Sequence, residues 1–483
     1  MLITTGSGAV RGRNHNGANV FLGIPYAAPP VGAARFAAPA PHPGWTGIRD
    51  AAVAGPTAPQ PARDAFGGLD MSPFFGPGWV RGDDYLTANV WAPEDARKRP
   101  VMVFVHGGGF VSGSKSSPLY DGSSFARGGI VMVTINYRLG VPGFLDVAGA
   151  PPNRGLLDVM AGLRWVRDNI AGFGGDPDNV TVFGQSAGAT IVAALLATPN
   201  AAGLFRRAIV QSGSGTGTFH PEQAARVTEA VGAALGVRPT AEGLAEVPDE
   251  RLVRITPALS GLDLRTADRF DPLVGLSPFG LVLERQPVED VTGEVDLIVG
   301  TNAEEGNLYL APGGDLDSTT PDDVLATAAR AHRDPAGLVA TYRAARPGAS
   351  HGELRSAILG DALFGAGNRL LAEAHSRSQG RTHVYEFAWR SSALDGRLGA
   401  AHGVELPFVF DRTGLAEVTG PNALLGAGEP PAALTTLMHN AWISFAENGD
   451  PGWERFGESR RTLRIAENPV VVDDPRGEEL RAW

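Results

Sequence analysis

The stretch that decides the fold is "NVTVFGQSAGAT", residues 179–190, in which one serine stands between two glycines directly after a strand-like run. The residues from Val180 to Phe183 are β-branched or aromatic and favour a strand, and "ATIVAALLA", residues 189–197, favours a buried helix. Ser186 therefore lies where a strand turns sharply into a helix. The glycines at 184 and 188 remove the Cβ atoms that would clash in such a turn.

The pattern G-x-S-x-G by itself leaves two interpretations open. Ser186 is either a catalytic nucleophile that the turn lifts clear of the backbone, or an ordinary residue of a glycine-rich turn. Chance matches to the pattern are expected in a chain that has 64 glycines among 483 residues. The decision depends on whether the rest of the sequence supplies the partners that a nucleophilic serine needs.

Composition excludes several other kinds of chemistry. The chain has no cysteine, which excludes disulfides, thiolate metal sites and cysteine nucleophiles together. Its ten histidines are scattered without H-E-x-x-H spacing, so we expect no metal site. A net charge of −11 without a basic cluster argues against nucleic acid and acidic membranes as partners.

The first residues and the overall composition indicate the location and source of the protein. The first residues, "MLITTGSGAVRG", lack both a basic leader and an apolar core, so we expect no signal peptide and a cytoplasmic protein. A hydrophobic content of 43% and a charged content of 19% are typical of a globular protein, and no run approaches a transmembrane helix in length. Nearly all basic residues are arginine, which together with abundant Ala and Gly indicates a bacterial source with a GC-rich genome.

Short apolar runs alternate with helical patterns along the chain. The runs that predict buried strands are "VMVFVH" (101–106), "IVMVTINY" (130–137), "VTVF" (180–183), "RAIVQSG" (207–213), "VDLIVGTN" (295–302) and "THVYEFAW" (382–389). This alternation predicts an α/β fold, with a central, mostly parallel sheet covered by helices on both faces. We expect one catalytic domain over residues 1–483, with helical insertions at about 220–262 and 319–347.

In such a sheet, sites form at the carboxyl ends of the strands, and three of these ends carry polar residues. The first end is "VHGGGF", residues 105–110, where three glycines follow a strand. Acyl transfer needs backbone N–H groups aimed at a developing oxyanion, and glycine lets the main chain approach it closely. A flexible turn is the alternative, but an H-G-G-G run is an oxyanion loop in esterases. The N–H of Ala187, directly after the serine, would supply another donor.

The other two strand ends supply a candidate acid and a candidate base. "GTNAEEGN", residues 300–307, holds Glu304 and Glu305, although paired glutamates in a loop are usually solvated surface. "GAAHGVELPF", residues 399–408, places His402 on a loop beyond a strand, whereas the other histidines after Glu305 lie in segments that favour surface or core positions. The order serine, acid, histidine matches that of the α/β-hydrolases.

These segments belong to a wider set that resembles the type B carboxylesterases, the family of bacterial para-nitrobenzyl esterases, animal liver carboxylesterases and cholinesterases. The resemblance covers nearly the whole chain. The segments that carry it are "FLGIPYAAPPVGAARF" (21–36), "DDYLTANVW" (83–91), "HGGGF" (106–110), "NYRLG" (136–140), "GDPDNVTVFGQSAGA" (175–189), "GTNAEEG" (300–306), "AHGVELPFVF" (401–410) and "WISFAENGDP" (442–451).

The resemblance implies an α/β-hydrolase fold with helical insertions and long loops that line a gorge. It implies a serine carboxylesterase that hydrolyses neutral carboxylic esters through an acyl-enzyme, with Ser186 as nucleophile, Glu305 as acid and His402 as base. The oxyanion donors that it implies are Gly108, Gly109 and Ala187. No cofactor is needed, the partner is a small ester, and the chain is expected to be a monomer, although an oligomer stays open.

The resemblance also implies two structural ion pairs, and one departure from the family affects the substrate. The ion pairs join Arg35 to Asp83 and Arg138 to Asp361. Tyr85 stands where the animal enzymes have the cysteine of a loop-closing disulfide, so the conformation of residues 59–82 is not carried over, and neither are the acyl-pocket residues near 270–275. The aromatic residues of this loop are expected to form an apolar gorge wall that gives no special preference for choline esters: Phe74, Phe75 and Trp79.

Two alternative functions stay open at this point. Adhesion proteins of this family keep the fold and lose triad residues, whereas all three are present here. An amidase or carbamate hydrolase could use the same site, provided that it protonates a poorer leaving group. Comparing the hydrolysis of an aryl ester with that of its matched anilide separates an esterase from an amidase.

Overall fold

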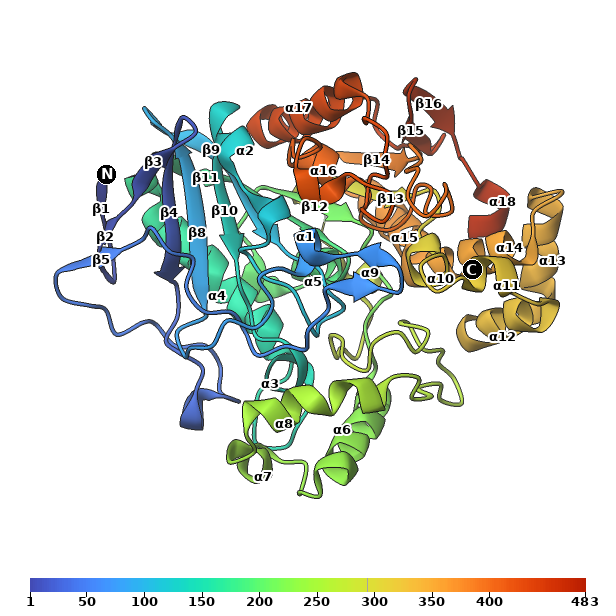
Figure 1. Cartoon of the computed structure of the whole chain (residues 1–483), viewed down its shortest axis with the longest axis horizontal. Coiled ribbons are helices and arrows are strands. Elements are labelled where there is room, and N and C mark those ends of the chain that lie inside the picture. Colours follow the sequence, from blue (N-terminus) through green and yellow to red (C-terminus); the bar gives the residue numbers. More distant parts are fainter. Residues whose placement is uncertain (293) are drawn as a thin grey trace.

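The computed structural model describes residues 1–292 and 294–483, and a large twisted sheet runs through the molecule (Figure 1). In the described residues this sheet has eleven strands. From one edge to the other they are β16 (Val470–Asp473), β15 (Arg461–Ile465), β14 (Thr382–Phe387), β13 (Asp296–Asn302), β12 (Arg207–Gln211), β11 (Gly175–Gln185), β9 (Arg99–Val105), β10 (Val131–Ile135), β8 (Thr87–Pro93), β4 (Ala18–Pro25) and β3 (Arg13–His15).

The direction of the strands divides the sheet into a parallel centre and antiparallel edges. Every neighbouring pair from β10 to β15 is parallel. Antiparallel pairing adds β8, β4 and β3 at one edge and β16 at the other. The six predicted strand segments are β9 to β14, so the mostly parallel sheet is confirmed, whereas the antiparallel edge strands were not predicted.

Both faces of the sheet are covered, and each face has its own apolar core. Successive residues of a strand point to opposite faces. Val103 packs in the core beneath α4 (Arg154–Asn169) and α5 (Ala187–Leu196), and Phe104, its neighbour in β9, packs in the core beneath α17 (Ala432–Asn448). Continuous apolar strands such as β9 are therefore buried on both sides, as the sequence predicts for a parallel sheet.

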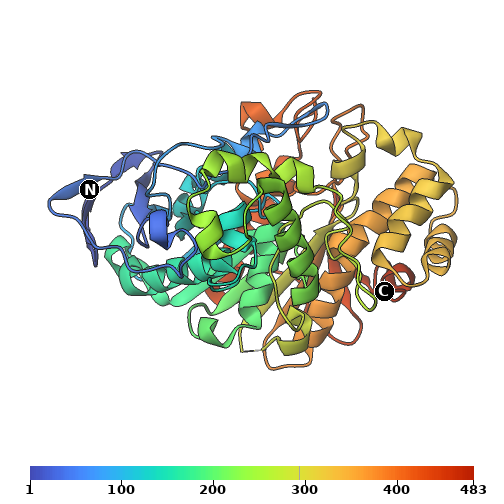
Figure 2. The ribbon, with the colours of Figure 1, turned by 90° about the horizontal axis from the view of Figure 1, so that it is seen from below.

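The two predicted insertions are helical. Their helices, with the pair that follows the second insertion, are α6 (Pro221–Leu235), α7 (Ala241–Ala245), α8 (Asp249–Arg254), α12 (Pro321–Ala331), α13 (Pro335–Ala345), α14 (His351–Gly360) and α15 (Ala366–Ser376). Helices α6 to α8 and helices α12 to α14 form two separate groups (Figures 1 and 2). Helix α12 begins after Thr320, whose side chain accepts from the Asp323 N–H, and Pro321 takes the first helical position.

Shorter elements complete the described fold. They are β1 (Leu2–Thr5), β2 (Gly8–Arg11), β5 (Ile48–Asp50), β6 (Ala65–Phe66), β7 (Leu69–Asp70), α1 (Ser72–Phe75), α2 (Ser123–Arg127), α3 (Gly140–Phe144), α9 (Pro287–Asp290), α10 (Asn307–Leu310), α11 (Asp315–Ser318), α16 (Leu406–Val409) and α18 (Gly477–Leu480). Strands β1, β2 and β5 form a small separate sheet, and β6 pairs with β7.

The loop that lacks the family's disulfide is fastened by hydrogen bonds. The side chain of Gln60 donates to the Gly113 carbonyl at 3.0 Å and accepts from the Gly113 N–H at 2.8 Å. The Ser117 hydroxyl donates to the carbonyl of Pro73. Through Gln60 and Pro73, residues 59–82 are therefore attached to the segment that follows β9.

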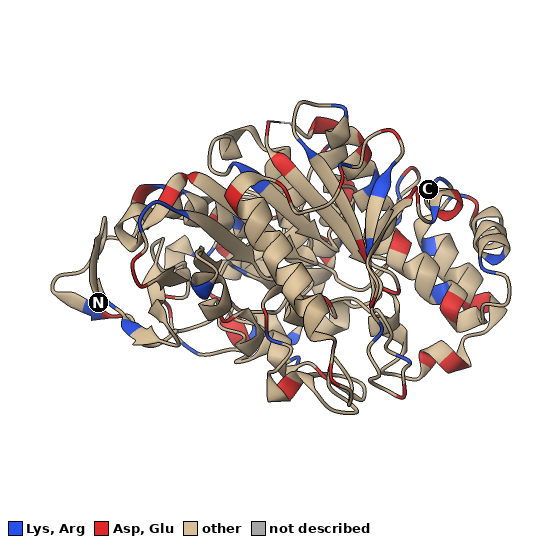
Figure 3. Cartoon of the chain, turned by 90° about the horizontal axis from the view of Figure 1, so that it is seen from above, with Lys and Arg blue, Asp and Glu red and all other residues tan. Residues whose placement is uncertain are grey.

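Charged residues of both signs are interspersed over the chain (Figure 3). Acidic residues outnumber basic ones, which gives the net charge of −11. Among the helices of the described residues, none is long and apolar enough to cross a membrane.

The first implied ion pair differs in the structure. A guanidinium nitrogen of Arg35 lies 3.4 Å from Oδ1 of Asp249 in α8, so Arg35 pairs with Asp249 rather than with Asp83. The Arg35 guanidinium also donates to the carbonyl of Val247 at 2.7 Å. The first helical insertion thus supplies the carboxylate, which the spacing along the chain could not reveal.

The second implied ion pair is also wrong. Arg138 pairs with Asp158 of α4 at 2.7 Å, with both side chains completely buried, whereas Asp361 pairs with Arg476. The Asp158 carboxylate accepts from Nε, from NH2 and from the backbone N–H of Arg138. Burial alone lowers the pKa of Arg138, but the Asp158 carboxylate outweighs burial and raises that pKa. The pair ties α4 to the segment after β10.

Removing the carboxylate of this pair should destabilise the protein strongly. Asp158→Ala leaves the buried Arg138 guanidinium unpaired, so we expect a loss of about 3–5 kcal/mol in the free energy of unfolding. Urea denaturation followed by circular dichroism measures this loss. Asp168→Ala, which breaks an exposed ion pair with Arg167 in the same helix, is the control, and it should cost less than about 1 kcal/mol. Equal losses in the two variants would contradict a structural role for the buried pair.

Candidate active site

Ser186 lies at the predicted sharp turn between β11 and α5. Its φ of 58° falls in the left-handed region that side chains disfavour. Backbone hydrogen bonds hold this conformation: the Ser186 N–H donates to the Gln211 carbonyl at 3.0 Å, and the Ser186 carbonyl accepts from the Thr190 N–H at 2.9 Å. A Cβ at Gly188 would lie 2.1 Å from the carbonyl oxygen of Val105, so the turn requires glycine there.

Glu305 and His402 meet next to this turn. Glu305 follows the end of β13, His402 lies on the loop after β14, and the Nδ1 atom of His402 is 2.7 Å from Oε2 of Glu305. The other Glu305 oxygen accepts from the Ser212 hydroxyl at 2.6 Å and from the Asn302 N–H at 2.7 Å. Both side chains of the pair are buried. Because Nδ1–H donates to the carboxylate, Nε2 of His402 is free to accept a proton.

The side-chain amide of Gln185 contacts the Nε2 atom of His402. The amide nitrogen of Gln185 lies 3.1 Å from Nε2, and with the proton on Nδ1 the amide is the donor. Among the described residues, no hydrogen bond joins the Ser186 hydroxyl to His402. The ring must therefore exchange Gln185 for the serine before it can act as a base. Sequence reasoning missed Gln185, although its place directly before the serine was the available signal.

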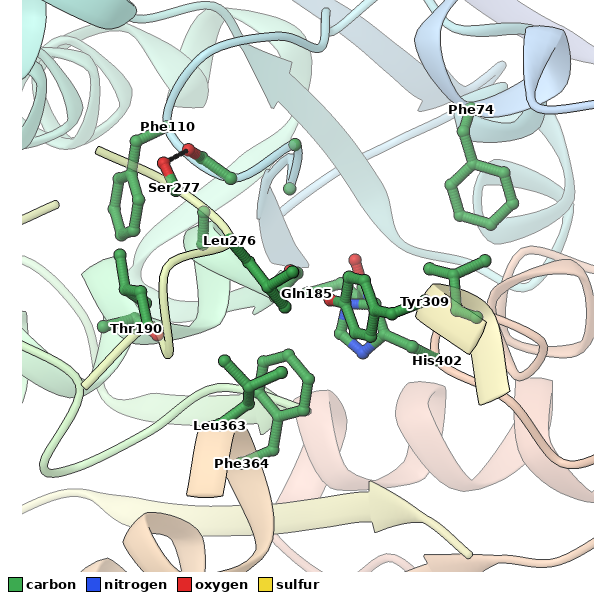
Figure 4. Close-up of a pocket in the computed structure, with 18 of the residues that line it drawn as sticks. Phe74, Phe110, Gln185, Thr190, Leu276, Ser277, Tyr309, Leu363, Phe364 and His402 are labelled. Atoms are coloured by element: carbon green, nitrogen blue, oxygen red, sulfur yellow. Dashed lines mark hydrogen bonds between the residues drawn. The ribbon is translucent and has the colours of Figure 1, made fainter. Parts of the chain in front are cut away.

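Aromatic rings fix the orientation of His402. The Phe364 ring stacks on the imidazole with centroids 4.4 Å apart and planes within 8°, and the Tyr309 ring lies 6.0 Å away (Figure 4). Phe364 belongs to a single π-helical turn, Asp361–Gly365, between α14 and α15. An aromatic face next to the imidazole stabilises the ring when it carries a positive charge.

The carbonyl groups of the glycine loop after β9 are held by hydrogen bonds. The Gly107 carbonyl accepts from Nδ1–H of His106 at 2.8 Å, and burial lowers the pKa of His106 to about 4, so this imidazole is neutral at neutral pH. The Gly108 carbonyl accepts from the Ser112 N–H at 3.1 Å. In a trans peptide the following N–H points opposite to the carbonyl. The N–H groups of Gly108 and Gly109 therefore point away from these acceptor bonds.

The N–H of Ala187 is the third donor of this set. It is the first N–H of α5, a position that has no partner within a helix. In the described residues, none of the three N–H groups has a hydrogen-bond acceptor. All three residues line the same cavity as Ser186. The structure thus brings the predicted serine, acid, base and oxyanion donors to one place.

This cavity has an apolar, largely aromatic wall (Figure 4). The large apolar residues that line it are Phe66, Met71, Phe74, Phe75, Phe110, Leu273, Leu276, Leu308, Leu363 and Phe364. Phe74 and Phe75 form part of the wall, as expected. Trp79 does not line the cavity, because its ring lies 3.8 Å from the guanidinium carbon of Arg81. Leu273 and Leu276 come from the region whose acyl-pocket residues the resemblance could not supply.

A second buried carboxyl group, Glu405, lies behind the His402–Glu305 pair. Oε2 of Glu405 accepts from the Asn302 amide at 2.7 Å, and the residue is completely buried. Burial, and then the nearby charge of Glu305, raise the pKa of Glu405 to about 7. Glu405 is therefore partly protonated at neutral pH. Sequence reasoning missed it, although a charged residue inside the apolar run "VELPFVF" was a signal.

Glu304 holds the loop that carries His402. One of its oxygens accepts from the Ala400 N–H at 2.8 Å, and the carboxylate pairs with Arg390. It makes no hydrogen bond with the His402 ring, so of the two glutamates only Glu305 binds the imidazole. Among the described residues, no group of three or more His, Asp or Glu side chains is arranged to hold a metal ion.

Comparisons with known proteins agree with this geometry. The sequence model of the carboxylesterase family matches residues 1–483. The chain is 38% identical to phenmedipham hydrolase of Pseudarthrobacter oxydans, over 99% of this chain and 95% of that protein. It is 35% identical to para-nitrobenzyl esterase of Bacillus subtilis, over 99% and 97%. A solved carboxylesterase of Geobacillus stearothermophilus superposes with a TM-score of 0.85 at 34% identity, covering 100% of this chain and 99% of that one.

The contact between Gln185 and His402 predicts a charge effect on the pH profile. Gln185→Glu places a carboxylate beside Nε2, where it stabilises the imidazolium and holds the ring away from Ser186. Since only neutral imidazole accepts the serine proton, we expect the acid limb of kcat/KM for an aryl ester to move to higher pH. Stopped-flow rates from about pH 5 to about pH 9 cover the titration range of histidine.

Gln185→Met is the matched control for this experiment. It removes the hydrogen bond to Nε2 without adding a charge, so the acid limb should move less than it does in Gln185→Glu. If the limb moves no further in Gln185→Glu than in Gln185→Met, residue 185 is not in contact with His402 in the working protein.

Proposed function

This chain belongs to the carboxylesterase family and is a carboxylic ester hydrolase, and we propose that it acts through a triad of Ser186, His402 and Glu305. The observation that carries the proposal is the 2.7 Å bond between Nδ1 of His402 and Oε2 of Glu305, beside a serine on a strained strand-to-helix turn. The proposed oxyanion donors are the N–H groups of Gly108, Gly109 and Ala187.

The first half of the reaction forms an acyl-enzyme. His402 leaves Gln185 and accepts the proton of Ser186 through Nε2 as the serine oxygen attacks the ester carbonyl. The carbonyl oxygen becomes an oxyanion between the backbone donors, each of which is worth about 2.7–4 kcal/mol in a comparable enzyme. His402 then gives its proton to the leaving alcohol, and the acyl group stays on Ser186.

The second half of the reaction releases the acid. Water takes the place of the alcohol, His402 accepts its proton, and a second tetrahedral intermediate collapses to free Ser186. Two hydrogen bonds besides that of His402, from the Ser212 hydroxyl and the Asn302 N–H, hold the Glu305 carboxylate in place. Its charge stabilises the imidazolium, and the stacked Phe364 ring adds to that stabilisation.

We also propose one catalytic domain over residues 1–483, a cytoplasmic location, a monomer and a bacterial source. Relatives from Pseudarthrobacter and Bacillus support the bacterial source. The net charge of −11 and the interspersed charges of Figure 3 support a small ester, rather than nucleic acid, as the partner.

The nucleophile is tested by substitution and by covalent labelling. Ser186→Ala should lower kcat for an aryl ester by about 10⁴-fold or more, because the residues of such a triad act as a unit. A fluorophosphonate probe should label Ser186 alone in the unaltered protein, as read by mass spectrometry of peptides. Ser318→Ala, at an exposed position in α11, is the control and should keep full activity. Labelling of another serine, with activity retained in Ser186→Ala, would move the nucleophile elsewhere.

An amidase or carbamate hydrolase that uses the same triad is the alternative to an esterase. Both need the same attack on a carbonyl, but an amide needs protonation of a poorer leaving group. The ratio of kcat/KM for an aryl ester to that for its anilide separates them. An esterase should strongly prefer the ester beyond the difference in intrinsic reactivity.

The cavity wall favours an uncharged reacting ester over a cationic one. Burying the apolar surface of a substrate against this wall contributes about 25 cal/mol per Å² to the binding free energy. The cavity also contains a cation of its own, Arg63, which repels a quaternary ammonium group. We therefore propose neutral esters with modest acyl and alcohol groups, without a preference for choline esters.

Butyrylcholine and its uncharged isostere, 3,3-dimethylbutyl butyrate, test this choice, since they differ mainly in charge. We expect kcat/KM for the choline ester to be no higher than that for the isostere, measured by pH-stat. A preference of about tenfold or more for the cation would correspond to about 1.4 kcal/mol of charge recognition and would exclude the neutral-ester proposal.

A further inference from the structure

Arg63 is the unusual member of the cavity wall. Of the described residues that line the cavity, it is the one Arg, Lys, Asp or Glu; the others are apolar, aromatic, glycine or uncharged polar residues and His402. Arg63 is half-buried, and burial lowers the pKa of its guanidinium, with Tyr309 opposing the shift. A charged side chain in such surroundings is costly unless it has a partner.

Within the described chain, most of the hydrogen-bonding capacity of Arg63 is unused. Its NH1 atom donates to the Gly108 carbonyl at 3.2 Å and to the Ser112 hydroxyl at 3.4 Å. A guanidinium has five N–H donors, and Nε and NH2 of Arg63 have no acceptor among the described residues. No described carboxylate forms an ion pair with it, in contrast to Arg138, which pairs with Asp158.

The aromatic neighbours of Arg63 stabilise its charge but accept no conventional hydrogen bond from it. Its guanidinium carbon lies 4.7 Å from the ring centre of Phe66 and 5.3 Å from that of Phe75. These contacts favour a cation at this place. They leave the N–H groups of Nε and NH2 available to a molecule in the cavity.

The position of Arg63 places it beside the oxyanion loop rather than in it. A Cβ built on Gly109 would lie 3.5 Å from NH1. The Gly108 carbonyl that NH1 binds is on the opposite side of its peptide from the Gly109 N–H, which is a proposed oxyanion donor. Arg63 therefore faces a part of the substrate next to the reacting carbonyl, not the oxyanion itself.

We propose that Arg63 recognises an oxygen acceptor on the acyl or alcohol arm of the ester substrate, either a carboxylate or a second carbonyl. A guanidinium fork matches such oxygens, and hydrogen bonds from a charged donor are the stronger kind. The inference rests on the proposed function and specifies its substrate class. A second carbonyl keeps the ester neutral, whereas a carboxylate makes it anionic, and the experiment distinguishes the two.

Two series of matched esters test the proposal, one for each arm. The acyl series is methyl hexanoate, dimethyl adipate and monomethyl adipate; the alcohol series is hexyl acetate, methyl 6-acetoxyhexanoate and 6-acetoxyhexanoate. In each series the chain ends in an alkyl group, a neutral carbonyl group or a carboxylate. Acid release by pH-stat gives kcat/KM, corrected for the two equal ester groups of dimethyl adipate, and only the acetate released from methyl 6-acetoxyhexanoate is counted, as identified by mass spectrometry of the products.

The variants are chosen so that loss of recognition differs from loss of structure. Arg63→Gln removes the charge and keeps an amide of moderate length. Arg81→Gln is the matched control, because Arg81 also stacks on an aromatic ring of the same loop but is exposed and outside the cavity. The quantity compared is the preference, which is kcat/KM for the oxygen-bearing ester divided by kcat/KM for the alkyl ester.

We expect Arg63→Gln to lower the preference by about tenfold or more in at least one series, with Arg81→Gln unchanged, since a charge-assisted hydrogen bond is worth that much. Loss confined to the carboxylate ester identifies an anionic substrate, and loss for both oxygen-bearing esters identifies a carbonyl acceptor. An equal fall for all three esters of both series would overturn the proposal and leave Arg63 as a brace of the Gly108 loop.

A failure of the proposed function would look different. If the unaltered protein hydrolyses none of the six esters and Ser186 takes no fluorophosphonate label, the triad proposal fails. If Ser186 is labelled in Arg63→Gln and the preferences equal those of the unaltered protein, the triad stands and the recognition role of Arg63 is excluded.

Discussion

The close approach of the turn at Ser186 to its neighbouring strands is the constraint on which the rest of the site depends. Residue 188 has no room for a side chain because the carbonyl of Val105, at the end of β9, lies against it. The same turn is fixed from the other side by the carbonyl of Gln211, at the end of β12. Strands β9, β11 and β12 are thereby held in register at the ends from which the glycine loop, Ser186 and the Ser212 that binds Glu305 follow. A loosening at this one contact would displace all three together.

The parallel centre of the sheet and the order of its site segments were predictable because they follow from patterns within single segments. Buried parallel strands read as continuous apolar runs, and residues that end neighbouring strands meet at one edge. The strand ends that carry Ser186, the Glu304–Glu305 pair and His402 are therefore found by spacing and chain order, whereas the choice of Glu305 and the role of each residue came from the resemblance to the family. The antiparallel edge strands were missed because their pairing depends on partners far away in the chain, as for β4 with β8.

The contacts that the sequence did not reveal are those between segments that differ from the family or lie far apart. Arg138 meets Asp158 because α4 packs beneath the end of β10, and the choice between that carboxylate and Asp361 depends on three-dimensional packing. Gln185 and Glu405 were visible as letters, but their roles depend on distances to His402 and Glu305. Trp79 was expected in the cavity wall, and a stacking partner, Arg81, holds it elsewhere.

The π-helical turn Asp361–Gly365 makes the position of Phe364 a matter of helical phase. An α-helix rotates by about 100° for each residue, and a π-helical turn accommodates one additional residue within an otherwise α-helical run. Loss of a single residue here would restore a regular helix and swing the Phe364 ring off the imidazole of His402. An insertion or deletion in α14 or α15 would therefore reorient the Phe364 ring relative to His402, even though no residue in contact with the imidazole is substituted. The counterpart of Phe364 in a relative can be identified only where the two sequences are aligned correctly to the residue.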